Sequence, residues 1–365
     1  MAATLSCGRR RLFCLQGGSG FDHNPADTGA GRSMTILAGD LGGTKTVLAL
    51  YRDEDRIGRP YRSEKFASSE YTDLDSIVAR FLNGGGETPR AAAFGVAGPI
   101  IAGKAYITNL SWEIDPERLG RSFGIASIGL LNDLQATAIA VPHLAPEDRC
   151  TLSTGVPEPN GLIAVMAAGT GLGMAFLVPT SRGYRAFPSE GGHMSFAPRG
   201  EVEAELHAFV RKRIGHVSFE RICSGTGLPN IYDYLRSSGR CREPDWLREE
   251  LGRVDDPTPV IVQTALQERA EICMATLDIF VSALAGAVGN MSLVLLPVGG
   301  VYLGGGIPPR IIKRLQKPDF IEGIHDKGRF RPLLERIPVH IILDPQAALH
   351  GAACRARELA NSLGR

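Results

Sequence analysis

A glycine-rich turn between two apolar runs constrains the fold of this chain more than any other feature. The apolar residues 35–38 lead into Asp40, Gly42 and Gly43, and the Thr-Lys-Thr triplet 44–46 precedes a second apolar run. This pattern predicts a strand, a tight polar turn and a second strand. Glycines let backbone N–H groups approach phosphate oxygens, a lysine and hydroxyls donate to them, and a carboxylate can hold Mg²⁺. An ordinary glycine-rich hairpin with a solvated lysine fits the same residues.

A second turn of the same kind occupies residues 168–173, with the sequence Ala-Gly-Thr-Gly-Leu-Gly between two apolar runs. Neither turn matches a familiar nucleotide motif. The first is not a Walker A loop because Thr44 precedes Lys45 and a strand follows, and the second fits no G-x-G-x-x-G register. A structural hairpin is again the alternative. Two strand–turn–strand units, one in each half, nevertheless indicate a duplicated architecture with a cleft between two lobes.

Apolar strands alternate with helical segments along the remaining sequence, which predicts an α/β fold with ligands at strand ends. The strand at 128–131 delivers Asn132 and Asp133 to its carboxyl end. A third glycine-rich turn, at 299–307, leads from a strand into a helix that starts with proline. We further expect a strand at 293–296, a hairpin after residue 99, and helices at 73–82, 134–141, 201–213, 229–236, 260–287 and 345–363.

Composition excludes several classes of protein. A chain of 365 residues can form two domains, and a net charge of +1 gives no reason to expect nucleic acid or an anionic membrane as partner. The 7 cysteines are scattered and never form a C-x-x-C pair, which favours free thiols in a reducing, cytoplasmic setting. Residues 279–309 carry no charge, but Asn290, Pro297 and glycines divide them. We therefore expect a buried helix and two core strands rather than a membrane span.

The first 33 residues differ from the rest of the chain. Three arginines at 9–11 lie in a Gly/Ser-rich segment without a sustained apolar run, so the segment has no signal-peptide core. We expect a flexible extension over residues 1–33. A start site upstream of the true Met34 and a poor organelle-targeting sequence are the alternatives.

These motifs, in this order, resemble the sugar kinases of the actin/hexokinase/Hsp70 ATPase superfamily, and more narrowly the bacterial-type glucokinases. The resemblance spans the chain from about Met34 to the C-terminus. Any one motif is weak, whereas the ordered set is specific. The matching segments are the two phosphate motifs 39–46 and 168–173, the adenosine motif 299–307, and the segments 131–133, 189–198 and 218–228.

The resemblance implies a two-lobed actin-like ATPase (ribonuclease H-like) fold, duplicated, with a cleft between the lobes. Residues 34–142 and 344–365 would form a small α/β domain, and residues 143–343 a large α/β domain. The implied reaction is transfer of the ATP γ-phosphate to the 6-hydroxyl of D-glucose, a step of glycolysis. A cytoplasmic homodimer is the expected form of the enzyme.

The resemblance also implies the site. Asp133 at a strand end is the expected general base, and Asp40 is expected to hold Mg²⁺ through water. A hexose is a disc of hydroxyls, so several directed polar groups must recognise it. For the sugar these are Asn109, Asn132, Asp133, Glu190, His193 and Glu220. For ATP they are Asp40, Gly42, Gly43, Thr44, Lys45, Thr46, Gly169, Thr170, Gly171, Gly304 and Gly305.

Each of these side chains also has a purely structural interpretation. Asp133 could be the N-cap of the following helix, Glu190 a solvated loop acid, Glu220 a surface charge and His193 a structural histidine. The residues after His193, Met-Ser, depart from the family's small or β-branched residue followed by aspartate, which bears on sugar preference. No cysteine follows until 223, which argues against zinc and the related repressor/sugar-kinase group. A kinase for a related hexose and a catalytically silent ATP/sugar sensor are the alternative functions.

Overall fold

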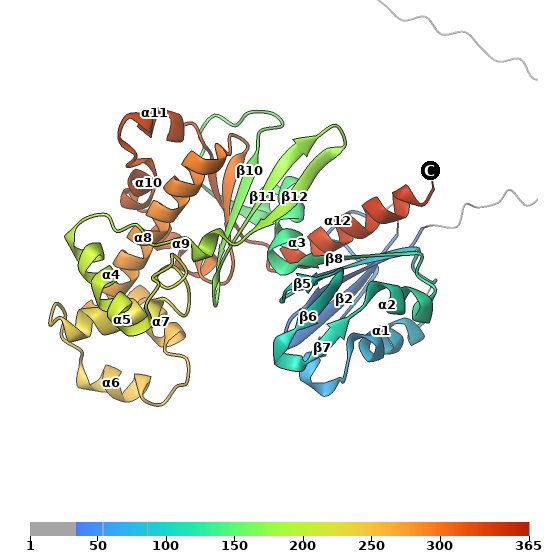
Figure 1. Ribbon diagram of the computed structural model, residues 1–365, viewed down its shortest axis with the longest axis horizontal. Coiled ribbons are helices and arrows are strands. Elements are labelled where there is room, and N and C mark those ends of the chain that lie inside the picture. The colour runs from blue at the N-terminus through green and yellow to red at the C-terminus, as the bar shows by residue number, and fades with distance from the viewer. Residues whose placement is uncertain (1–33, 53–54, 86, 365) are drawn as a thin grey trace, which may run out of the picture. The chain divides into compact units, whose positions relative to one another are not determined.

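Two β-sheets organise this chain in the computed structural model, which describes residues 34–52, 55–85 and 87–364 (Figure 1). The expected extension 1–33 therefore lies outside the described residues. The first sheet has the order β3-β2-β1-β4-β8. Its strands are β1 (Ile36–Leu41), β2 (Lys45–Tyr51), β3 (Arg62–Ala67), β4 (Ala91–Val96) and β8 (Ser127–Asn132).

Register in the first sheet brings the polar ends of its strands together. β1 and β2 form the expected antiparallel hairpin, while β1, β4 and β8 run parallel. Asp40 is level with Gly95, and Gly95 is level with Leu131. Because parallel strands end at the same edge, Asp40 and the residues after Leu131 lie at one edge of the sheet.

The second sheet repeats this arrangement in the order β12-β11-β10-β13-β14-β9. β10 pairs antiparallel with β11 and parallel with β13, and β13 runs parallel to β14, which is the pattern of β1, β2, β4 and β8. The expected duplicated architecture is thereby confirmed at the level of strand order. The strands are β9 (Arg149–Ser153), β10 (Ile163–Ala168), β11 (Leu172–Thr180), β12 (Gly183–Ser189), β13 (Gly300–Gly304) and β14 (Val339–Ile342).

Helices cover the first sheet and link it to the second. α12 (Ala347–Ser362) packs a small-residue face, including Ala352 and Ala356, on β1 and β4. It also crosses α3 (Asp133–Ala140) so closely that a Cβ on Gly351 would lie 1.7 Å from the Ala136 carbonyl oxygen. α3 in turn contacts β11 and β12 of the second sheet. Further elements of this half are α1 (Leu74–Asn83), α2 (Pro116–Phe123) and the small sheet of β5 (Ile100–Ile101), β6 (Lys104–Ile107) and β7 (Trp112–Ile114).

The remaining helices pack around α8 (Glu271–Leu295), whose residues from Ile272 to Ser292 are largely buried. Within the described residues, α8 is the one helix long and apolar enough to cross a membrane, and 72% of its most apolar window is buried inside the fold. It is the core helix that the sequence predicted. α5 (Leu228–Ser237), α7 (Thr258–Leu266), α10 (Pro318–His325) and α11 (Arg331–Leu334) contact it. The other helices of this half are α4 (Glu201–Ile214), α6 (Asp245–Leu251) and α9 (Ile312–Leu315).

Two expectations about this region were wrong. The single helix expected over 260–287 is two helices, because the chain turns left-handed at Glu268 (φ 55°) and the Arg269 N–H donates back to the Thr264 carbonyl. The strand expected at 293–296 is the last turn of α8 and its cap, so one strand rather than two follows the buried helix. Neither Gly nor Pro marks the break at 267–270.

Candidate active site

The first turn, between β1 and β2, is closed by its own backbone. The Gly42 N–H donates to the Lys45 carbonyl at 2.9 Å, and the Ser68 hydroxyl donates to the Gly42 carbonyl at 2.8 Å. Thr44 and Lys45 are exposed. Thr46, which the sequence grouped with the ATP-binding residues, is completely buried, and its hydroxyl lies 3.0 Å from Ser68 Oγ. Its side chain therefore anchors the turn, and its part in ATP binding stays a prediction.

Two carboxylates meet beside this turn. Asp40 is the penultimate residue of β1. Burial raises its pKa, which the nearby Lys45 ammonium partly lowers and the Asp133 carboxylate raises further. Burial likewise raises the pKa of Asp133 above its ordinary value, against the effect of backbone hydrogen bonds. Protein surrounds Asp133 on most sides, yet the residue keeps an exposed face. Such a recessed carboxylate is a stronger base than a free aspartate and stays accessible.

The helix-capping role considered for Asp133 belongs to its neighbour. Asn132 is the N-cap of α3, and its Oδ1 accepts from the Gln135 N–H at 2.6 Å. Asp133 is the first helical residue, and its Oδ1 accepts from the Leu134 N–H at 2.8 Å. That bond fixes the carboxyl at the helix N-terminus and leaves Oδ2 to accept a proton.

Asn109 approaches the first turn from a short 3₁₀ helix, Thr108–Leu110. A Cβ added to Gly43 would lie 3.7 Å from both Cβ and Nδ2 of Asn109. The structure therefore brings this amide beside the turn, and its contact with the sugar stays a prediction. Asp40, Lys45, Asp133 and Asn109 form a first cluster at the edge of the first sheet.

Glu220 ties the second turn to the expected sugar-binding residues. Its Oε2 accepts from the Leu172 N–H at 3.0 Å, and a Cβ on Gly171 would lie only 2.5 Å from the same oxygen. Its Oε1 lies 3.8 Å from Nδ1 of His193. Glycine at 171 is thus required for the carboxylate to reach the turn, and Glu220 is not a free surface charge.

His193 lies between two carboxylates. Its Nε2 is 3.8 Å from Glu190 Oε2, and the two side chains are 59% and 89% exposed. Groups so exposed and so loosely paired are free to turn towards a ligand. The His193 carbonyl is held by Nε2 of His216 at 3.0 Å, which fixes the short helix Gly191–His193 that carries the imidazole. Glu190, His193 and Glu220 form a second cluster.

α3 joins the two clusters. Leu134, which follows the candidate base, packs so tightly on β11 that a Cβ on Gly173 would lie 2.7 Å from its Cδ2. Gln135 Nε2 donates to the Ala186 carbonyl of β12 at 3.2 Å. The first turn of α3 is thereby fixed to the strands that lead into the second cluster.

The third turn completes a pocket with the second. The Ile307 N–H donates to the Ala168 carbonyl at 3.0 Å, and a Cβ on Gly169 would lie 3.9 Å from the Gly306 nitrogen. Gly305, at φ +84°, lies against the Ala168 backbone, where a Cβ would approach to 2.5 Å. Gly304 is buried at the end of β13, so it shapes the turn without being exposed to a ligand. The pocket beside these turns has a volume of about 1070 Å³.

Part of this pocket was missed by sequence reasoning. Its far wall comes from residues 255–259, Asp-Asp-Pro-Thr-Pro, and from Val262 and Leu266 of α7. Gly225 and Thr226 also line the pocket, next to the second turn. Their N–H groups donate to the Gly169 and Thr170 carbonyls at 2.7 and 3.2 Å. The Asp-Asp-Pro segment that precedes α7 was the available signal. Nothing in the local sequence shows that this segment faces a turn almost 90 residues earlier.

Comparisons of sequence and of structure both match this chain to glucokinases. A sequence model described as Glucokinase matches residues 37–359. A glucokinase of Nostoc punctiforme is 41% identical over 338 residues, covering 88% of this chain and 99% of that protein. A solved glucokinase from an Antarctic psychrotroph is 30% identical with a TM-score of 0.80, over 89% of this chain and 99% of the other. A ROK family glucokinase from Streptomyces griseus, solved with glucose and AMPPNP, is 18% identical with a TM-score of 0.60 over 89% and 99%, which shows a shared fold. The chain belongs to the glucokinase family.

Proposed function

We propose that this chain is a glucokinase, which transfers the γ-phosphoryl group of ATP to the 6-hydroxyl of glucose. The observation that carries the proposal is the recessed carboxylate of Asp133 beside the Asp40 turn. Family membership supports it, as do the names of the curated relatives. The Streptomyces griseus relative, solved with glucose and AMPPNP, supports a site that holds sugar and ATP together.

Asp133 is the general base of the proposed reaction. Its fixed Oδ1 orients the carboxyl, and Oδ2 accepts the proton of the 6-hydroxyl as the oxygen attacks the γ-phosphorus. The raised pKa favours this acceptance, because it makes the carboxylate a stronger base than a free aspartate. The remaining catalysis is positioning and neutralisation of charge on the phosphates.

The two turns and the large pocket are proposed to hold ATP. The pocket beside the second and third turns suits the nucleoside, and the exposed Thr44 and Lys45 suit the terminal phosphates. Mg²⁺ binds through one or two carboxylates together with phosphate oxygens and waters, and Asp40 offers such an oxygen ligand. Within the described residues there is no cluster of three or more metal-ligating side chains, so the phosphates and waters would complete the coordination. Mg²⁺ when bound would neutralise phosphate charge.

The sugar is proposed to lie between the two clusters. Carboxylates of Glu190 and Glu220 and the imidazole of His193 supply directed partners for its hydroxyls. Asn132 uses Oδ1 as a helix cap, and within the described part of the chain its Nδ2 has no hydrogen-bond partner and can donate to a hydroxyl. Closure of two lobes around the sugar, a homodimer and a cytoplasmic location remain predictions.

A hexose panel tests the proposal directly. ADP release is measured with glucose, mannose, fructose and N-acetylated hexoses at saturating ATP. Glucose is expected among the best substrates by kcat/KM. A kinase for another hexose would prefer that sugar, which is of interest because exposed Met194 adjoins His193. A silent sensor would bind ATP and glucose without turnover.

A further inference from the structure

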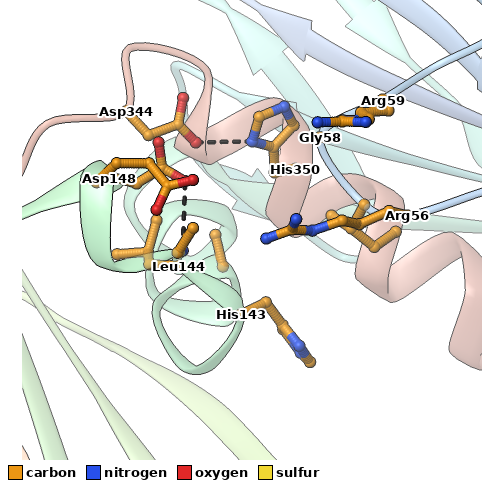
Figure 2. A pocket seen from close by; sticks show the side chains of 12 residues that line it. Arg56, Gly58, Arg59, His143, Leu144, Asp148, Asp344 and His350 are labelled. Carbon is orange, nitrogen blue, oxygen red and sulfur yellow. Dashed lines mark hydrogen bonds and ion pairs between the residues drawn. The ribbon is translucent and has the colours of Figure 1, made fainter.

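A second, smaller pocket lies where the chain passes between the two sheets (Figure 2). Its volume is about 170 Å³, below the range of roughly 300 Å³ and more that is typical of drug-sized ligands. Both connections line it: the segment 143–148 leads into β9, and Asp344 lies between β14 and α12. The Leu343 N–H donates to the Asp148 carbonyl at 2.7 Å, which joins the two connections.

A loop that follows β2 presents two arginines to this pocket. Arg56 and Arg59 are exposed, and neither forms an ion pair within the described residues. Gly58 between them turns at φ +95° over the ring of His350. Arg357 of α12 holds the loop by donating to the Asp55 carbonyl at 2.7 Å. The loop is thus fixed on α12 with two guanidinium groups at the pocket.

His350 carries an unused nitrogen in the same place. Its Nδ1 lies 2.6 Å from Asp344 Oδ2, as Figure 2 shows. Burial raises the pKa of Asp344, but the hydrogen bond to His350 lowers it more, and the pKa lies below its usual value. Asp344 is therefore a carboxylate, and it accepts a hydrogen bond from Nδ1. Nε2, on the far side of the ring, is buried without a hydrogen-bond partner in the described structure. A buried polar atom normally has a partner, so this nitrogen marks a position for a ligand atom.

The opposite wall is acidic. Glu147 and Asp148 contribute carboxylates to this wall. His143 adds no positive charge there, because burial lowers the pKa of its ring and leaves the ring neutral at pH 7. A ligand that is anionic throughout would be repelled here, and an apolar one would leave charged groups without partners. The pocket therefore suits a small molecule with an anionic end and a hydroxyl-bearing end.

We propose that this pocket binds a phosphomonoester of a small sugar. Arginine guanidinium groups match phosphate oxygens in number and geometry, so Arg56 and Arg59 receive the phosphate. His350 Nε2 carries a lone pair in the tautomer whose Nδ1–H donates to Asp344, so it accepts from a hydroxyl of the ligand. Carboxylates accept from hydroxyls, so Glu147 and Asp148 receive the sugar. The product of the proposed kinase reaction is such a molecule, and in this respect alone the inference rests on the proposed function. Because both connections line the pocket, an occupant would restrain movement between the halves and slow turnover.

Calorimetry on the full chain tests the inference. Glucose and ADP are kept saturating so that the active site is filled, and glucose 6-phosphate or inorganic phosphate is titrated in. Both are expected to bind. Arg56→Ala/Arg59→Ala should weaken binding by about 10-fold or more, equivalent to the loss of one charge-assisted hydrogen bond. Arg52→Ala is the matched control, since Arg52 stands on the same loop but stacks on Tyr61 outside the pocket. It should leave binding unchanged.

Each outcome bears on the proposal. Absence of binding, or equal binding by the double variant, overturns it. Equal affinity for inorganic phosphate and glucose 6-phosphate overturns the part assigned to Glu147 and Asp148, whereas tighter binding of the sugar phosphate supports it. Glucose 6-phosphate should also slow turnover in a way that saturating glucose does not relieve, and the double variant should lose this effect. Since the phosphate titration needs no turnover, the pocket and the kinase activity can fail independently.

Discussion

The two sheets share a strand order but differ in the chemistry at their central strand ends. β1 has Asp40 as its penultimate residue, whereas β10 has Ala167 in the same place. The strand–turn–strand unit of the first sheet ends beside two carboxylates, while that of the second ends among glycines, a threonine and the large pocket. One copy of the duplicated unit therefore suits metal and proton chemistry, and the other suits a nucleotide.

A second pair of residues extends the comparison. Asp133 follows the last parallel strand of the first sheet, and Asp344 follows the corresponding strand of the second. The helices that follow them connect the two halves: α3 contacts strands of both sheets, and α12 covers the first sheet. Asp133 is recessed with a raised pKa, whereas Asp344 is paired with His350 and its pKa is lowered. Position in the duplicated fold does not decide the role; the surroundings of each carboxylate do.

The largest expected effect separates these two aspartates. Asp133→Ala should lower kcat by roughly 10²–10⁴-fold, because the variant has no general base. Glucose binding should remain detectable by calorimetry. Asp344→Asn is the matched control and should change kcat of the folded enzyme by no more than a few-fold. Near-normal turnover of Asp133→Ala would remove Asp133 from the role of base.

Sequence predicted the parts of the molecule that depend on local chemistry. Strands and the three glycine-rich turns were identified because glycine and β-branched runs act over a few residues. The helix break at 267–270 was missed since it depends on a left-handed Glu268, a conformation that sequence does not favour there. The far wall of the large pocket was missed because it is assembled from distant segments. The burial of Thr46 follows from Ser68, which lies 22 residues away and has no local signal.

A smaller effect concerns pH. The pKa of Asp133 is raised by burial, so kcat/KM for glucose at saturating ATP should fall on acidification at a higher pH than an ordinary aspartate would give. Lys45 lowers the pKa of Asp40, and Asp133 raises it. Lys45→Met should therefore raise the pKa of Asp40, as followed by NMR titration of its carboxyl group. A pKa of Asp40 that stays in place or falls would contradict the coupling.

Unfolding does not explain this acid limb. A carboxyl whose pKa is raised by folding binds its proton more tightly in the folded state. Its contribution to stability is present at low pH and is lost as pH rises through the folded pKa. Asp40 and Asp133 therefore favour the folded state on acidification, and loss of activity there reports the base. Circular dichroism across the same pH range provides the control.

The smallest effect distinguishes the two threonines of the first turn. Thr46→Val removes the buried bond to Ser68 and should cost about 1 kcal/mol of unfolding free energy, as measured by urea denaturation. Thr44→Val changes an exposed side chain at the proposed phosphate site, so it should leave stability unchanged and raise the KM for ATP. Reversal of these results would place Thr46 at the ligand and Thr44 in the scaffold. The two variants thus distinguish a threonine of this turn that contacts the phosphates from one that stabilises the turn.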